Sequence, residues 1–220
     1  DIKNKYCTKY DIVGHWGLNS NANDESPYSN TGTTYGNPTW NTSGVIDGSI
    51  DLDGTDDYVY CGNSDILKPQ YRDFTVECWL KPNALPTSYA GIVFKGNGNM
   101  NTQDGWFLRY YANTGKVYFH MGDGTNNLGG MWVDYVLPLN EWTHVVVVVD
   151  RNDGYFAYAN GTLVGNYTID TSGNEVNGTS LYIGRDWSTS DYFFDGEIDE
   201  VKVYRKALSS YEVLNQYNDQ

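Results

Sequence analysis

The chain has 220 residues, of which 40% are hydrophobic and 19% are charged, and its formal net charge at pH 7 is −14. This composition excludes a disordered chain and predicts a globular protein with a single core. The acidic excess makes nucleic acid and anionic lipid poor partners, because phosphate binding needs clustered Lys and Arg. It suits calcium, with simple solubility as the alternative explanation. The longest aliphatic run, Val145–Val149, is far too short to insert into a membrane.

Residues 1–11 are predicted to form an N-terminal extension, and residues 12–220 a single domain, since no repeat or long linker divides the chain. The three cysteines, Cys7, Cys61 and Cys78, match no zinc or redox spacing. Cys61 and Cys78 fall at apolar positions of strand patterns. We interpret both as small core residues, with a disulfide as the alternative, and assign no role to Cys7.

Most of the chain is predicted to be β-strand, because short apolar segments are separated by Gly- and Asn-rich turns. The continuous apolar run 144–149 (HVVVVV) has no polar face, so it should lie centrally in a sheet and be covered on both sides. The predicted strands are 74–80, 105–111, 116–121, 141–150, 154–159, 162–168, 180–185 and 198–205.

One helix is predicted, at the C-terminus. Ser209 and Glu212 have the spacing of a capping box, in which each side chain bonds to the backbone of the other. Tyr211, Leu214 and Tyr217 then recur at helical spacing, so one face of the helix can pack on the strands.

Four segments, taken together and in order, resemble laminin G-like domains of the concanavalin A-like lectin/glucanase superfamily. The resemblance covers roughly residues 12–217. It implies an all-β jelly roll of two antiparallel sheets, one of them concave. It also implies a module of a larger secreted or cell-surface protein that binds glycans or proteins, often with a structural calcium ion. The four segments are SIDLDGTDDYVYCG (49–62), FTVECWLKP (74–82), NEWTHVVVVVDRNDGYFAYANGTLVG (140–165) and DGEIDEVKVYRKALSSYEV (195–213).

The segment GEIDEV raises the question of catalysis, because glucanases of the same superfamily carry an E-x-D-x-E strand. Alternate side chains of a strand share one face, so that pattern directs three acidic groups into one cleft. Here Val201 occupies the third position, and Glu200 is predicted to face the side opposite Glu197 and Asp199. The sequence therefore predicts a protein that is not an enzyme.

A calcium site is implied by the resemblance. Carried over to this chain, its ligands are the Asp199 side chain, the Gly54 carbonyl and Asn19, while Asp24 in the following loop could supply a further carboxylate. Oxygen ligands of this kind suit Ca²⁺. The alternative is that Asp199 only accepts backbone N–H groups. Residues 51–57 (DLDGTDD) lack the Gly and Glu of an EF-hand loop and are not interpreted as one.

Strand alternation also predicts a ligand-binding face. One set of side chains on strands 105–111 and 116–121 should point away from the core onto the concave sheet, where aromatic rings and donors can hold a sugar. Two loop-like tryptophans could stack on sugar rings too, with loop packing as the alternative. The candidates are Phe107, Arg109, Tyr111, Tyr118 and His120, together with Trp132 and Trp187.

These observations lead to three hypotheses about function. The first is a lectin-like, non-catalytic carbohydrate-binding module with a structural calcium ion, whose partner is a glycan or a glycosylated surface. The second is a protein-binding adhesion module of the same fold that uses its loops. The third is an enzyme, either a glycoside hydrolase or a polysaccharide lyase with Arg109, Tyr111, Tyr118 and His120 in its active site.

Overall fold

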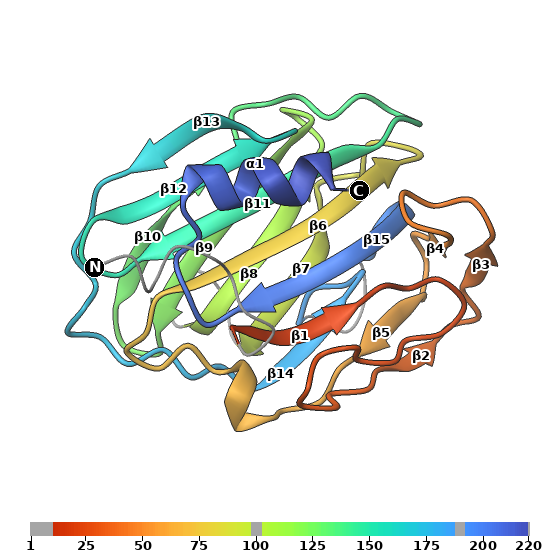
Figure 1. The fold of residues 1–220 in the computed structure, drawn as a ribbon. Coiled ribbons are helices and arrows are strands. Elements are labelled where there is room, and N and C mark those ends of the chain that lie inside the picture. The colour runs from red at the N-terminus through yellow and green to blue at the C-terminus, as the bar shows by residue number, and fades with distance from the viewer. Residues whose placement is uncertain (1–10, 98–102, 188–191, 220) are drawn as a thin grey trace.

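A computed structural model of the chain describes residues 11–97, 103–187 and 192–219. Two antiparallel sheets lie face to face, as Figure 1 shows, and form the jelly-roll sandwich expected from the sequence. The first sheet has the order β13-β12-β11-β6-β15-β4-β3, with β1 paired to β15, and the second has the order β10-β9-β8-β7-β14-β5-β2. Cys7 and most of the predicted N-terminal extension lie outside the described residues.

The first sheet is built from segments spread over the whole chain. Its strands are β1 (Ile12–Trp16), β3 (Thr39–Asn41), β4 (Ser49–Asp53), β6 (Phe74–Pro82), β11 (Thr143–Asp150), β12 (Gly154–Ala159), β13 (Thr162–Tyr167) and β15 (Asp195–Tyr204).

The second sheet comes mostly from the middle of the chain, and one 3-10 turn, η2 (Asp65–Leu67), connects the sheets. Its strands are β2 (Thr33–Tyr35), β5 (Tyr58–Tyr60), β7 (Tyr89–Asn97), β8 (Asp104–Tyr111), β9 (Lys116–Asp123), β10 (Asn127–Trp132) and β14 (Ser180–Ile183). All eight segments predicted as strands are strands.

The predicted helix is α1 (Ser210–Asn218), and both bonds of its capping box, between Ser209 and Glu212, are present. The helix packs on the outer face of the first sheet (Figure 1), where Val213 joins a small apolar cluster with Val146 and Val148 of β11. The other valines of β11 belong to the main core between the sheets. The run 144–149 is therefore covered on both sides, as predicted.

The main core contains Cys61 and Cys78, which are both buried and free, so their interpretation as small core residues is confirmed. Burial raises the pKa of both thiols, which keeps them protonated. Over the described ranges, no helix is long and apolar enough to cross a bilayer.

Candidate functional site

The face of the second sheet that is turned away from the core carries the five predicted strand residues, Phe107, Arg109, Tyr111, Tyr118 and His120. Their neighbours in the chain, such as Trp106, Leu108 and Phe119, belong to the core. Strands β8 and β9 pair so that Phe107 lies opposite His120 and Arg109 opposite Tyr118. The prediction that these side chains share the outer face is confirmed, and it follows from the period of two along a strand.

Three of the five are nevertheless covered, which corrects the expectation of an open platform. Phe107, Arg109 and His120 are 0%, 3% and 1% exposed. Arg109 is covered by the loop after β14, whose Asp186 pairs with it at an Nε–Oδ2 distance of 2.5 Å. Phe107 lies between the Phe94 and His120 rings, and His120 also contacts Asn127 of β10. Arg109 and His120 therefore cannot contact a polysaccharide, and the proposed lyase active site is not supported.

These buried residues form a layer of stacked groups beneath the surface. The Phe107 ring lies 5.2 Å from the His120 ring, centroid to centroid, and the Arg109 guanidinium lies 3.7 Å from the Phe107 centroid. Burial lowers the pKa of His120, so its ring is neutral at pH 7, and its Nε2 lies 2.9 Å from Asn127 Oδ1. Each group of the layer therefore packs on the next.

The accessible part of the face is a group of three rings, Tyr111, Tyr118 and Trp132, which we call the aromatic platform. Trp132 is 38% exposed and the two tyrosines are half-buried. The Trp132 centroid lies 4.9 Å from that of Tyr118 and 5.3 Å from that of Tyr111. Trp132 was expected in a loop but ends strand β10, where it lies opposite Tyr118. The rings come from three adjacent strands and present edges and faces at different angles.

Trp187 does not join the platform. Its side chain is 44% exposed, and its backbone N–H donates to the carboxylate of Asp186. Among the residues that the structure describes, no ring contact links Trp187 to the other six candidates. Its role in ligand binding stays a prediction.

A second group of aromatic residues on the same sheet was missed from the sequence. Tyr35 stacks on Tyr58 with ring centroids 4.7 Å apart, and the Arg185 guanidinium lies 4.5 Å from the Tyr58 centroid and 5.0 Å from that of Tyr182. The YVY pattern of residues 58–60 could have indicated it, since alternate tyrosines share a face.

Asp199 and Asn19, two of the four predicted metal ligands, bind the same loop. The Oδ2 atom of Asp199 accepts hydrogen bonds from the N–H groups of Val45 and Ile46, and Asn19 Oδ1 accepts one from Gly48. Asp199 is fully buried, its Oδ1 has no hydrogen-bond partner among the described residues, and burial raises its pKa to about 7. An unpartnered buried carboxylate oxygen is the donor that a cation requires.

Two glycines of the loop that Asp199 and Asn19 bind leave room for carbonyl oxygens. A Cβ on Gly48 would lie 2.3 Å from the Asn19 carbonyl oxygen and 2.6 Å from that of Asn41. A Cβ on Gly44 would lie 1.9 Å from the Gly48 carbonyl oxygen and 2.7 Å from Asp199 Oδ2. Carboxylate, amide and carbonyl oxygens together fit the hard-oxygen preference of Ca²⁺.

Gly54 lies away from Asp199, which corrects its assignment as a ligand. Strand β15 pairs with β4 so that Asp195 lies opposite Asp53, whereas Asp199 lies four positions further along β15. At roughly 3.3 Å per residue, Asp199 is about 13 Å along the strand from Asp195, which lies beside the turn that contains Gly54. Gly54 instead makes a turn with φ 72°, and a Cβ there would lie 2.8 Å from the Asp195 Cβ. The sequence could not place it because the register is set by long-range pairing.

Asp24 is also used for another purpose. Its Oδ1 accepts from the N–H groups of His15 and Ser26, and its Oδ2 accepts from the N–H and the amide of Asn30. Both oxygens are thus occupied in holding the loop after β1. We find no unfilled position on Asp24 for a metal.

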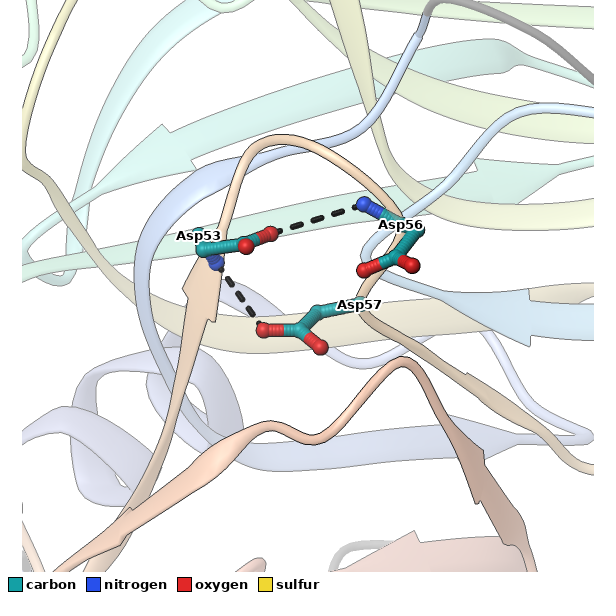
Figure 2. A group of neighbouring side chains, drawn as sticks. All are labelled: Asp53, Asp56 and Asp57. Atoms are coloured by element: carbon teal, nitrogen blue, oxygen red, sulfur yellow. Dashed lines mark hydrogen bonds between the residues drawn. The ribbon is translucent and has the colours of Figure 1, made fainter.

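A cluster of three carboxylates lies at the turn after β4 (Figure 2), where oxygens of Asp53, Asp56 and Asp57 lie within 4.8 Å of one another. Asp53 Oδ1 accepts from the N–H groups of Thr55 and Asp56. Asp57 accepts from the N–H groups of Asn37 and Asp53. Backbone donors of the turn therefore account for the arrangement without a metal.

The segment GEIDEV contains a β-bulge that the sequence did not reveal. The pairing of β15 with β6 is broken between Asp199 and Lys202, and Glu200 has a φ of 50°. Ile198 and Val201 both enter the core, so Glu200 lies on the outer face with Lys202, at 2.7 Å between Oε2 and Nζ. The prediction that Glu200 faces the side opposite Glu197 and Asp199 is wrong, because a bulge reverses the alternation.

These carboxylates are nevertheless buried and engaged. Glu197, Asp199 and Glu200 are 7%, 0% and 4% exposed. Glu197 pairs with Lys81 at 2.8 Å and accepts from the Ser49 hydroxyl. Burial raises the pKa of Glu200, but its bonds with basic partners outweigh this and hold it at about 2, far below what a general acid needs. The geometry offers no exposed carboxylate pair for hydrolysis on this strand.

A cavity of about 770 Å³ lies on the other side of the molecule, beside α1. It is lined by β11, β12 and the start of the helix, including Phe156, Tyr158 and Tyr211. Tyr211 is 60% exposed. This cavity contains none of the candidate residues from the sequence.

Comparison with known proteins shows where this architecture occurs. The family model described as concanavalin A-like lectin/glucanases superfamily matches residues 53–214. Botulinum neurotoxin type X from Clostridium botulinum is 26% identical over 149 residues, which are 66% of this chain. The chain spans only 11% of that toxin's length.

Solved structures that share the fold include the following two. One is domain 4 of AbnA, a GH43 extracellular arabinanase from Geobacillus stearothermophilus, in complex with arabinotriose. It is 20% identical to this chain with a TM-score of 0.69, and the match covers 93% of this chain and 97% of the arabinanase domain. The other is a structure of botulinum neurotoxin type C, a toxin whose cell entry depends on interaction with two ganglioside molecules. It is 16% identical to this chain with a TM-score of 0.73, and the match covers 96% of this chain and 52% of the toxin chain.

Proposed function

The chain belongs to the concanavalin A-like lectin/glucanases superfamily, and from this premise we propose that it is a non-catalytic carbohydrate-binding module. The observation that carries the proposal is the aromatic platform of Tyr111, Tyr118 and Trp132, partly exposed on three adjacent strands. Aromatic rings with polar edges can stack on the C–H faces of sugars while their hydroxyl and indole groups hydrogen-bond. A domain of an arabinanase solved with arabinotriose has the same fold, which supports a carbohydrate ligand.

The buried layer under the platform favours binding by pre-organisation. Phe107, Arg109 and His120 hold the strands from beneath, so little side-chain freedom remains to be lost when a ligand binds. The nearby Lys116 pairs with Asp134 at 2.5 Å. Because this lysine is already paired and the chain has a net charge of −14, we expect neutral glycans to bind better than anionic ones.

We also propose a structural Ca²⁺ held by Asp199 and Asn19, with the carbonyl groups of Asn41 and Gly48 nearby. The unpartnered Oδ1 of Asp199 supports this assignment. The ion would neutralise buried charge and join β15 to the loops at residues 19 and 44–48. Because it binds the folded state alone, it would raise stability by mass action. We further propose that the module is secreted or displayed on a cell surface, in keeping with the extracellular arabinanase that shares its fold.

A glycan array with the intact chain tests the carbohydrate proposal. Trp132→Ala should reduce binding of neutral glycans about fivefold or more, since one well-packed aromatic contact is worth on the order of 1 kcal/mol or more. The matched control is Tyr211→Ala, an exposed aromatic residue on α1. Undiminished binding by Trp132→Ala and Tyr118→Ala would refute the site, and breakdown of a bound polysaccharide would refute the absence of catalysis.

The alternative is a protein-binding adhesion module. One observation favours it, the cavity beside α1 with exposed Tyr211 and Leu214 at its helix. If Tyr211→Ala abolished binding to cells while Trp132→Ala left it unchanged, this alternative would replace the first proposal.

A further inference from the structure

Helix α1 closes over a buried histidine on the outer face of the first sheet (Figure 1). Tyr217 of the helix stacks on the rings of Trp79 and His144, with centroids 5.7 Å and 6.0 Å away, and those two rings lie 5.0 Å from each other. The His144 side chain is 0% exposed. It has no part in the functions considered above.

The His144 ring is buried without the polar contacts that a charged imidazolium needs. Neither ring nitrogen has a hydrogen-bond partner within residues 11–97, 103–187 and 192–219. Its Nε2 lies 3.9 Å from Oε2 of Glu77, an atom that also has no hydrogen-bond partner in those ranges. Burial, reinforced by the positive charge of Lys202, lowers the pKa of His144 to about 3. The closed structure therefore holds the ring neutral.

The charged groups that face the ring belong to a network that is already paired. Glu77 of β6 lies 3.3 Å from the Lys202 ammonium of β15 and accepts a hydrogen bond from the Tyr204 hydroxyl. Lys202 in turn pairs with Glu200 at 2.7 Å, and Glu200 Oε2 lies 3.0 Å from Nε2 of His15 on β1. The negative charge of Glu77 is thus shared with a lysine and cannot by itself stabilise a second buried cation.

Helix α1 is held on this face by few buried side chains. Of its nine residues, Glu212 and Val213 are the buried ones, and the cavity of about 770 Å³ lies beside its first turn. Strand β11, by contrast, lies between β6 and β12 inside the sheet. Local opening starts where little apolar surface is buried, so water reaches the His144 ring most readily by release of the helix.

We propose that α1 is an acid-sensitive cover, which leaves the first sheet when His144 takes up a proton. Release lets water solvate the imidazolium, and it exposes Trp79 together with Val146 and Val148, which lie in the apolar cluster beneath the helix. A helix of nine residues is not stable alone, so the released segment unfolds. The proposal does not depend on carbohydrate binding.

The direction of the pH effect follows from the two states of the ring. In the closed state the pKa of His144 is about 3, and in the released state it returns to its ordinary value of 6.5. Closure is therefore fully favoured above pH 6.5 and weakens as the pH falls toward 3.

Glu77 acts in the opposite direction at lower pH. Burial raises the pKa of this carboxyl, although Lys202 and Tyr204 oppose the shift. A raised pKa means that the closed state binds this proton more tightly, so protonation of Glu77 favours closure. The effect of His144 should consequently be clearest close to neutral pH.

Hydrogen exchange of the intact chain tests the proposal. After correction for the intrinsic pH dependence of exchange, the protection factors of the α1 amides, such as those of Val213 and Leu214, should fall about eightfold between pH 7 and pH 5.5. Amides of β8 in the second sheet should keep their protection. His144→Phe retains a ring in the stack but cannot be protonated, so the protection of α1 should then change less than about twofold. The matched control is His120→Phe, at a buried histidine of the second sheet, which should retain the eightfold fall.

Three results would overturn the proposal. They are equal protection of α1 at both pH values in the wild type, an equal fall at the β8 amides, and an undiminished fall in His144→Phe. A pH titration of the histidine ring signals by NMR needs no variant at His144. Its ring should titrate well below 6.5, and a midpoint near 6.5 would also contradict the proposal. Thermal unfolding at pH 7 checks that both variants are folded.

Discussion

The buried ion pair between Arg109 and Asp186 should be the strongest link between the loop after β14 and the candidate binding face. Its Nε–Oδ2 distance is 2.5 Å, and the two side chains are 4% and 0% exposed. Asp186→Ala leaves the guanidinium buried and unpaired, which typically costs about 3–5 kcal/mol. The rings of Phe107 and Tyr89, at 3.7 Å and 4.6 Å from the guanidinium, retain about 1–2 kcal/mol of cation–π attraction. Both ring contacts exist in the wild type too and soften the loss of the partner, so we expect the lower end of that range, a loss of about 3 kcal/mol.

Urea unfolding measures this loss directly. At this chain length, about 3 kcal/mol corresponds to a fall in Tm of roughly 6–12 °C. The matched control is the double variant Arg109→Leu/Asp186→Leu, in which neither charge remains, and it should be clearly more stable than Asp186→Ala alone. A cost below about 1 kcal/mol for Asp186→Ala, or a double variant no better than the single one, would refute the view that this pair is a desolvated, coupled contact.

Two further predictions concern the β-bulge and the proposed metal. Bonds with basic partners hold the pKa of Glu200 at about 2, below its unfolded value of 4.5. Its contribution of about 3 kcal/mol to stability is therefore present above pH 5 and is lost as the pH falls toward 2. In urea unfolding, Glu200→Gln should reduce this loss of stability between pH 5 and pH 2, and an unchanged loss would contradict the assignment. In thermal unfolding, Ca²⁺ should raise Tm relative to chelator in the wild type and not in Asp199→Asn, whereas equal Tm values for the wild type in both conditions would count against a calcium site.

Much of the fold follows from local sequence patterns. The eight strands with clear alternation or continuous apolar character were predicted, as was α1 with its capping box. Strand β7 was missed although it lies at the centre of the second sheet. Its sequence, YAGIVFKGN, is interrupted by Gly91 and Gly96 and has no clear period. Gly91 is required by a close approach, since a Cβ there would lie 2.2 Å from the Arg185 backbone, and such a contact has no local signature.

The candidate site shows where local reasoning fails. The alternation of side chains along a strand placed Phe107, Arg109 and His120 on the correct face. It could not show that all three are buried, or that Asp186, some 80 residues later in the chain, pairs with Arg109. The alternation rule also failed at Glu200. A β-bulge with a non-glycine residue at positive φ reverses the alternation there, and nothing in the sequence signals the bulge. Covering loops and bulges both depend on long-range packing.

The indole N–H signals of the seven tryptophans provide the most direct test of carbohydrate binding at the platform. They can be followed by ¹H–¹⁵N NMR during titration with a neutral oligosaccharide selected on the array, and the Trp132 signal is assigned from its absence in Trp132→Phe. The account predicts that Trp132 shows the largest shift, since its ring is the most exposed of the platform. A saturable titration in which Trp132 stays unchanged while another indole shifts would contradict it.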